Sequence, residues 1–145
     1  MALVNKSVLV AHSAQRMFDL VDGIEAYPEF LPWCGGSEVS VRSPERLVAS
    51  IQIDYMHIKQ RFSTENNNEA PHLIQMKLLD GPFRRLDGEW RFRALNDTAC
   101  KIEFVLHYEF STKLLDTVLG PVFGYIANSF VEAFIERADQ VYGAS

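Results

Sequence analysis

The chain has 145 residues, of which 48% are hydrophobic, 12% aromatic and 23% charged, which excludes a disordered or collagen-like chain. This length fits one domain, and we expect residues 1–145 to form a single domain. The formal net charge is −5 and no basic run exceeds the Arg84 and Arg85 pair, which excludes DNA as a general electrostatic partner. A shape-specific contact with a ribonucleoprotein stays open, because such a contact need not alter the net charge.

The two cysteines and the N-terminal sequence indicate a reducing compartment. Cys34 and Cys100 are too few for a disulfide framework and lack the spacing of a zinc site, so we expect two reduced, buried thiols. The N-terminal residues show no apolar region behind a positive stretch, so no secretory signal is predicted. No segment reaches the roughly 18 apolar residues that a membrane-spanning helix needs. These features predict a cytoplasmic protein.

The first third of the chain predicts one strand and one helix. Residues 4–11 form the expected strand, and Ser13 is the expected N-cap of a helix that begins at Ala14 and ends near residues 22–23. Residues 25–36 follow, with two prolines and a closing pair of glycines, which allow at most a short helical turn.

The middle of the chain predicts an antiparallel sheet. Apolar and polar residues alternate in consecutive short runs between residues 37 and 110, most clearly over 86–94 and 100–110. A period of two in short neighbouring strands indicates one polar and one apolar face. Residues 66–68 and 96–97, rich in Asn and Asp, are the expected turns.

The last segment, from about residue 114 to 142, changes to helical spacing and predicts a long amphipathic helix. Residues 117–131 carry no charge, and Gly120, Pro121 and Gly124 interrupt them. Two interpretations stay open, a tolerated kink in a packed helix or a hinge over an apolar space. The order of elements predicts an α+β fold with a curved antiparallel sheet against the last helix.

No catalytic or metal-binding motif occurs in the sequence, so we predict no catalytic residue, no metal and no cofactor. Six cations lie at outward positions of the expected strands. They form either a cationic stripe or cross-strand pairs with neighbouring carboxylates. These cations are Lys59, Arg61, Lys77, Arg91, Arg93 and Lys101.

Residues 27–33 contain three aromatic rings and a leucine, which is too apolar for an ordinary solvent loop. They either pack on the core, cover a cavity or contact an apolar partner. Residues 81–83 form a second short loop with a ring, which we expect to meet the first at one end of the sheet. Small residues at inward positions leave room for an apolar pocket: Ala49, Gly88, Ala94, Cys100 and Ala127.

Three segments, residues 27–34, 79–92 and 133–143, carry a family resemblance. In this order they resemble the bacterial coenzyme Q-binding proteins of the START-like superfamily. Their bacterial members are also named RatA-type ribosome-association toxins and are grouped with polyketide cyclase and lipid-transport domains. The resemblance implies a helix-grip fold, in which a curved seven-stranded antiparallel sheet surrounds the C-terminal helix and a lipid-sized tunnel lies between them.

The resemblance also assigns positions to the family motifs. The first motif implies residues near the tunnel mouth, and the other two cover the second loop and the last helix. The matching residues are Tyr27, Pro28, Phe30, Leu31, Pro32, Trp33, Gly81, Pro82, Phe83, Phe134, Arg137 and Ala138.

The leading hypothesis is non-catalytic binding and shielding of a hydrophobic ligand, ubiquinone or a related polyprenyl lipid as the resemblance implies, in support of respiration. A transient peripheral contact with the inner face of the membrane goes with it. Trp33, Phe30 and Phe83 would gate the tunnel, and residues 120–124 would form its movable edge. The predicted ligand-binding residues are Phe30, Leu31, Trp33, Ile51, Ile53, Phe62, Met76, Leu78, Phe83, Trp90, Phe92, Phe104, Leu106, Tyr108, Phe123, Ile126, Phe130 and Phe134.

Two alternatives stay open at this point. The resemblance implies a translation inhibitor that binds the large ribosomal subunit and blocks subunit association. A cyclase-type enzyme would instead need polar groups that converge inside the tunnel. The inward candidates for that role are Arg137, Tyr108, Tyr55 and Gln60.

Overall fold

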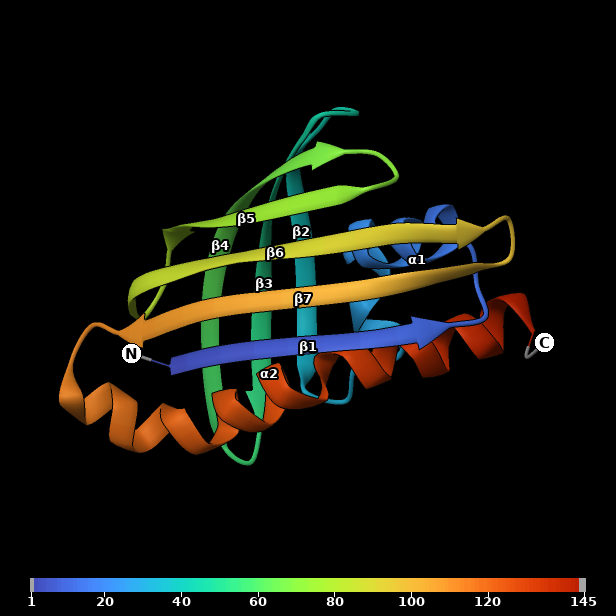
Figure 1. Cartoon of the computed structure of the whole chain (residues 1–145). Coiled ribbons are helices and arrows are strands. Elements are labelled where there is room, and N and C mark those ends of the chain that lie inside the picture. The colour runs from blue at the N-terminus through green and yellow to red at the C-terminus, as the bar shows by residue number, and fades with distance from the viewer. Residues whose placement is uncertain (1, 144–145) are drawn as a thin grey trace.

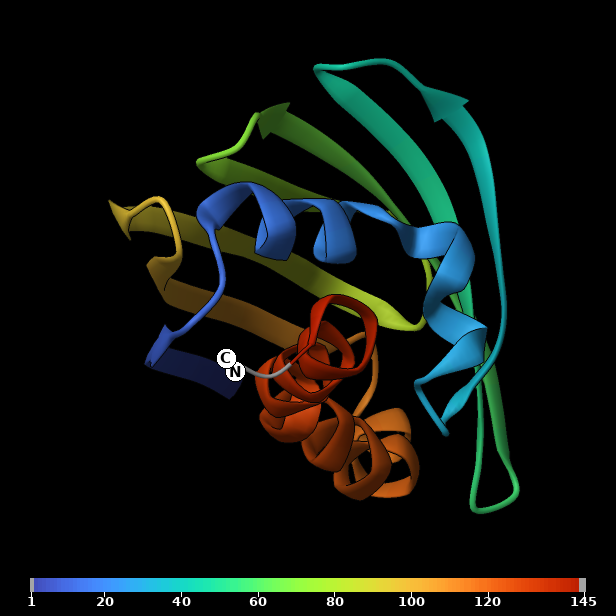
Figure 2. The ribbon, with the colours of Figure 1, turned by 90° about the vertical axis from the view of Figure 1, so that its right-hand side faces the viewer.

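The computed structural model describes residues 2–143, so the first residue and the last two of the expected domain lie outside the described residues. One seven-stranded antiparallel sheet has the order β1-β7-β6-β5-β4-β3-β2 and curves around the helices (Figures 1 and 2). The predicted α+β fold with a curved sheet and a long last helix is confirmed. The strands are β1 (Ala2–Val10), β2 (Cys34–Arg42), β3 (Arg46–Tyr55), β4 (Ile58–Glu69), β5 (Leu73–Asp80), β6 (Phe83–Asn96) and β7 (Ala99–Phe110).

The strands form because their side chains alternate between a wet and a dry face. In β7 each second residue from Cys100 to Phe110 is buried, and the residues between them are partly exposed. Because side chains alternate between the two faces of a strand, every second side chain of β7 faces the helices. The register Trp90↔Phe104 and Phe92↔Ile102 then joins buried residues of β6 and β7 on the concave face.

Three helical segments lie on the concave side of the sheet (Figure 2). The first, α1 (Ala14–Asp22), begins where the side chain of Ser13 accepts a hydrogen bond from the Arg16 amide, as predicted. A 3-10 helix, η1 (Ile24–Glu29), contains Pro28 and is the short turn expected there. The last, α2 (Lys113–Tyr142), begins at the N-cap Thr112 and spans the full length of the sheet (Figure 1).

A cluster of aromatic rings in the core lies between β6, β7 and the C-terminal half of α2. Trp90 and Phe134 are fully buried, and their ring centroids lie 5.5 Å apart at an interplanar angle of 88°. The ring centroid of Phe104 lies 4.4 Å from that of Trp90 at an interplanar angle of 36°, and the ring centroid of Phe130 lies 5.0 Å from that of Phe134. Edge-to-face rings of this kind add stabilisation beyond the apolar area that they bury.

α2 also meets the length and composition criteria for a membrane-spanning helix, with a mean hydropathy of 1.4 over its most apolar window. The expectation that no segment meets such criteria is therefore wrong. The core helix of a folded domain meets the same criteria, and here 33% of that window is buried. The apolar residues of α2 include Val131 and Phe134, which belong to the hydrophobic core of this domain.

Two local predictions from the sequence are wrong. Residues 66–68 are not a turn but belong to β4, where Asn66 pairs with Leu47 on one side and Met76 on the other. Ladder hydrogen bonds from both neighbouring strands override the turn preference of asparagine. Ala94 is exposed near the end of β6, so it opens no space in the core. The turn predicted at residues 96–97 is present but lies one residue later, at residues 97–98, because Asn96 still pairs with Ala99 at the end of β6. Both cysteines are free and buried as predicted.

Candidate functional site

An apolar cavity of about 60 Å³ lies between the concave face of the sheet and α2. Strands β3 to β7 form one wall, α2 forms the opposite wall, and α1, η1 and the segment after η1 close a third side. Nine of the predicted ligand-binding residues line it: Trp33, Ile51, Phe62, Met76, Phe104, Leu106, Phe123, Ile126 and Phe130.

Eight further lining residues were absent from the predicted set. They are Val21, Ile24, Tyr27, Thr64, Asn66, Ile74, Leu86 and Ala127. Leu86 and Ile74 follow the same strand alternation as the predicted residues, so periodicity alone would have found them. Thr64 and Asn66 are polar, and no hydrophobic pattern selects them.

A second, smaller cavity of about 10 Å³ lies beside the first, towards the N-terminal half of α2. Its lining includes Ile53 and Phe83 of the predicted set, together with Leu119 of α2. Phe62 and Phe123 border both cavities. The ring centroids of these two residues lie 6.3 Å apart, so their side chains form the partition between the two spaces.

The remaining predicted residues line neither cavity. Leu31, Trp90, Phe92 and Phe134 are at most 1% exposed and fill the core. Leu78 is partly buried against the core. Phe30 lines a surface groove beside α2, and Tyr108 lines a surface hollow near the end of β7.

The two aromatic segments do not meet at one end of the sheet, contrary to the expectation from the sequence. Phe83 is the first residue of β6 and contacts Phe123, at 4.9 Å between ring centroids. Trp33 instead contacts Phe130 of α2 at 5.8 Å. Trp33 and Phe83 are both buried, at 3% and 6% exposure, so these rings are packed walls in this conformation.

The cavity is small compared with a typical ligand pocket. Sites for small organic ligands usually measure about 300–1,000 Å³, and a water molecule occupies about 30 Å³ of the liquid. The 60 Å³ present here would hold about two waters. A lipid-sized ligand therefore requires α2 or the side chains around the cavity to move apart.

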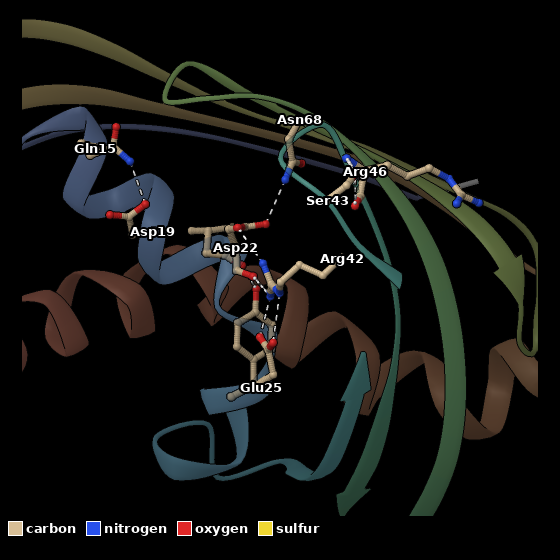
Figure 3. A network of polar contacts seen from close by, with 10 residues as sticks. Gln15, Asp19, Asp22, Glu25, Arg42, Ser43, Arg46 and Asn68 are labelled. Atoms are coloured by element: carbon tan, nitrogen blue, oxygen red, sulfur yellow. Dashed lines mark hydrogen bonds and ion pairs between the residues drawn. The ribbon is translucent and has the colours of Figure 1, made fainter. Parts of the chain in front are cut away.

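A polar network fixes the wall that α1 and η1 contribute (Figure 3). Asp22, at the end of α1, accepts hydrogen bonds from Arg42 at 3.1 Å and from the Asn68 amide at 2.9 Å. Arg42 also donates to Glu25 at 2.6 Å. Burial opposes ionisation of Glu25, but the hydrogen bond and charge of Arg42 outweigh it and lower the pKa of this carboxyl group. The network ties α1 and η1 to β2 and β4.

Among the described residues that line the cavity, four side chains carry hydrogen-bonding groups, those of Tyr27, Trp33, Thr64 and Asn66, and none is charged. The hydroxyl of Tyr27 donates to the carbonyl oxygen of Val21, and burial raises the pKa of Tyr27 well above its ordinary value. The hydroxyl of Thr64 donates to Oδ1 of Asn66 at 3.1 Å. The cavity therefore offers hydrogen bonds without a fixed charge.

The four polar residues considered for a cyclase-type enzyme do not converge. Arg137 pairs with Glu29 at 3.1 Å and lies over the ring of Phe30. Tyr55 stacks on Tyr125 at 5.6 Å. In residues 2–143 no hydrogen bond joins any two of the four candidates, which are Arg137, Tyr108, Tyr55 and Gln60.

On the outer face of the sheet, the arginines pair with carboxylates. Arg91 contacts Glu89 at 2.7 Å, and Arg93 forms a cross-strand ion pair with Glu103. Arg61 lies 3.5 Å from Glu38. Arg93–Glu103 joins neighbouring strands and Arg91–Glu89 lies within β6, so carboxylates accompany these arginines and interrupt a continuous cationic stripe. Among the described residues, no group of three or more His, Cys, Asp or Glu side chains is arranged to hold a metal ion.

The sequence matches the family described as polyketide cyclase / dehydrase and lipid transport over residues 10–135. It is 43% identical over 143 residues to the ribosome association toxin RatA of Vibrio cholerae, covering 99% of each chain. It is 24% identical over 143 residues to the mitochondrial coenzyme Q-binding protein COQ10 homolog B of Xenopus laevis, covering 96% of this chain and 59% of that protein. The crystal structure of the Zhui aromatase/cyclase from Streptomyces sp. R1128 has the same fold, with a TM-score of 0.79 at 14% identity over 99% of both chains. These relatives have the family names that the three sequence motifs predicted, so the predicted family is confirmed.

Proposed function

Because the chain belongs to the polyketide cyclase / dehydrase and lipid transport family of START-like proteins, we propose that it binds and shields a hydrophobic ligand without catalysis. Ubiquinone or a related polyprenyl lipid is the proposed ligand, in support of respiration, and residues 1–145 act as one binding domain. The observation that carries the proposal is the uncharged cavity between the sheet and α2.

Apolar burial alone supplies enough affinity for such a ligand. Each CH₂ group removed from water contributes about 0.8 kcal/mol, so a polyprenyl chain needs no charged anchor. The cavity would widen by separation of α2 from β3 and β4, where Gly120, Pro121 and Gly124 weaken the helix. The proposed binding residues are those predicted from the sequence, together with the eight further residues that line the cavity.

The test is to extract the purified protein with organic solvent and to identify the bound molecules by mass spectrometry. We expect a quinone or another polyprenyl lipid in the extract, and added quinone should quench the fluorescence of Trp33, which lines the cavity. Ala127→Val places two more carbons in the cavity and should reduce uptake, whereas Ala138→Val lies outside it. An empty extract together with no uptake of added quinone would reject the proposal.

A second candidate function is association with the large ribosomal subunit, which would block the joining of subunits. It is favoured by the 43% identity over 143 residues to a protein named ribosome association toxin RatA. This function predicts co-sedimentation with the large subunit, weakened by Arg91→Glu or Arg93→Glu on the outer face and unaffected by Ala127→Val. Failure of the wild-type chain to sediment with large subunits would rule it out.

We further propose that the protein acts in the cytoplasm and contacts the membrane only at its surface. Exposed apolar side chains on the N-terminal half of α2 support a peripheral contact, with Leu114 at 73% and Val118 at 50% exposure. Flotation with lipid vesicles measures this contact, and Leu114→Ser combined with Val118→Ser should reduce it. Equal flotation of the wild-type and doubly substituted proteins would contradict a role for this surface.

A further inference from the structure

Strand β4 carries polar side chains at three consecutive inward positions, on the dry face of the sheet. Thr64, Asn66 and Asn68 are 6%, 4% and 7% exposed. β4 has a neighbouring strand on each side, and Asn66 lies between Leu47 of β3 and Met76 of β5. A buried amide without hydrogen-bond partners destabilises a fold, so each of these side chains calls for an explanation.

The two inward asparagines differ in what their amide groups contact. The Nδ2 group of Asn68 donates to the carboxylate of Asp22 at 2.9 Å and thereby fixes α1 to the sheet (Figure 3). Asn66 accepts one hydrogen bond at Oδ1, from the hydroxyl of Thr64 at 3.1 Å. Within residues 2–143 no group accepts a hydrogen bond from Nδ2 of Asn66, although this side chain lines the cavity. Asn68 therefore has a structural partner at Nδ2, although its buried Oδ1 accepts no hydrogen bond, whereas Asn66 retains an unused amide donor in a side chain that lines the cavity.

The charge of the surroundings limits what Asn66 can bind. Among residues 2–143, no Lys, Arg or His side chain lines the cavity, and neither does any carboxylate. An ionised group buried there would have no opposite charge, which makes its transfer from water strongly unfavourable. A neutral acceptor oxygen can take the Nδ2 hydrogen bond without that penalty. This excludes the carboxylate of a fatty acid and favours a carbonyl oxygen.

We propose that Asn66, oriented by Thr64, is the polar end of the ligand site and donates a hydrogen bond to the uncharged carbonyl oxygen of an otherwise apolar ligand. The proposal rests on the proposed function and defines the chemical class of the ligand. The apolar tail lies along β4, past the partition of Phe62 and Phe123, towards the second cavity beside Leu119. A ketone, an ester or a quinone satisfies this description.

The test is isothermal titration calorimetry with three probes of equal chain length: a benzoquinone with a decyl substituent, decylbenzene and decanoate. We expect the wild-type protein to bind the quinone at least tenfold more tightly than either of the other probes. Asn66→Leu keeps the side-chain volume and removes the donor. It should weaken quinone binding about tenfold, or about 1.4 kcal/mol, and leave decylbenzene binding unchanged or tighter.

Two further variants complete the design. Thr64→Val removes the hydroxyl that orients the amide and should weaken quinone binding by a smaller factor, about threefold. Asn67→Leu lies between the two inward asparagines but is exposed on the outer face, so it should change nothing. Circular dichroism of each variant checks that the fold is retained.

The outcomes separate this inference from the proposed function. Binding of none of the probes by the wild-type protein would reject both. Binding of quinone and decylbenzene with equal affinity, unchanged by Asn66→Leu, would overturn the role of Asn66 and leave the hydrophobic carrier function in place. Tighter binding of decanoate than of the quinone would overturn the assignment of an uncharged ligand.

Discussion

The two halves of α2 pack very differently against the same sheet. In the C-terminal half, Phe134 and Ala138 are fully buried, and Phe134 contacts Tyr27 as well as Trp90. In the N-terminal half, Leu114 is 73% exposed, and both cavities lie beneath the residues that face the sheet. A single helix thus combines a region that stabilises the fold with a region that leaves room for a ligand.

The difference arises from what covers each half. α1 and η1 lie over the concave face near the C-terminal half and add a third layer of side chains there (Figure 2). The second cavity, beneath the N-terminal half, is lined by no described residue of α1 or η1, and Gly120 and Gly124 lie in this half of the helix. Close packing requires side chains on every side of a region. At the N-terminal end of α2, the side that α1 and η1 cover elsewhere supplies few.

The strongest test of the comparison is to truncate one aromatic ring in each region. Phe134→Ala should lower the free energy of unfolding by about 3–5 kcal/mol, because the ring is fully buried. Phe62→Ala should cost about 2 kcal/mol, since Phe62 is partly buried and borders both cavities. Urea denaturation measures both values. Equal losses at the two positions would show that the regions are packed alike.

A matched pair of alanines on α2 tests the spare volume directly. Ala138→Val should destabilise the protein by about 1–3 kcal/mol, because no space surrounds this fully buried residue. Ala127→Val extends into the cavity and should change the stability by less than about 1 kcal/mol. The loss of helix propensity is the same at both positions, so it cancels in the comparison. Thermal denaturation gives both values, and a loss at Ala127 as large as that at Ala138 would contradict an accessible cavity.

Stiffening the loosely packed half should raise stability and slow ligand uptake. A Cβ atom at Gly124 would lie 3.9 Å from the Tyr108 hydroxyl, so Gly124→Ala fits and should stabilise the protein by about 0.8–1 kcal/mol. Gly88→Ala serves as the control, because its Cβ would lie 3.0 Å from the backbone carbonyl oxygen of Val105, which cannot rotate away, and should destabilise the fold. Stopped-flow fluorescence with added quinone measures uptake. An uptake rate unchanged by Gly124→Ala would argue against a hinge at this end of α2.

The reactivity of the two cysteine thiols reports whether each region opens. Below pH 9 the ionisation of these thiols leaves the stability of the fold unchanged. Burial raises the pKa of Cys100 from 9.0 to about 11, so about one thousandth is thiolate at pH 8. Burial also raises the pKa of Cys34, but this residue is 7% exposed, whereas Cys100 is 0% exposed, and it adjoins Trp33 at the cavity. We expect a maleimide to label Cys34 first and Cys100 only on unfolding, as measured by peptide mass spectrometry. Because the folded-state pKa of Cys100 is raised, its stabilising effect is lost as the pH rises from 9 towards 11. Simultaneous labelling of both residues would indicate that the molecule opens as one unit.

Much of the fold follows from local patterns in the sequence. The alternation in residues 86–94 and 100–110 predicts two strands, and Ser13 predicts the start of α1, because these signals depend on neighbours close in the chain. Half of the predicted ligand-binding residues line the main cavity for the same reason, since strand alternation selects the inward face. The helical spacing of apolar residues from about residue 114 to 142 likewise predicts a long amphipathic helix, which is α2.

The sequence by itself therefore determined the fold class, the inward face of each strand and the family. Only the tertiary structure decided which inward residues fill the core, as Trp90 does, and which border a cavity, as Ile126 does. It also placed Asn66, an expected turn residue, inside the sheet, where its Oδ1 accepts a hydrogen bond from Thr64. The physical reason is that a cavity and an unpaired amide depend on side chains brought together from distant strands. Hydrophobic periodicity records which way a residue points, and it carries no information about what lies opposite.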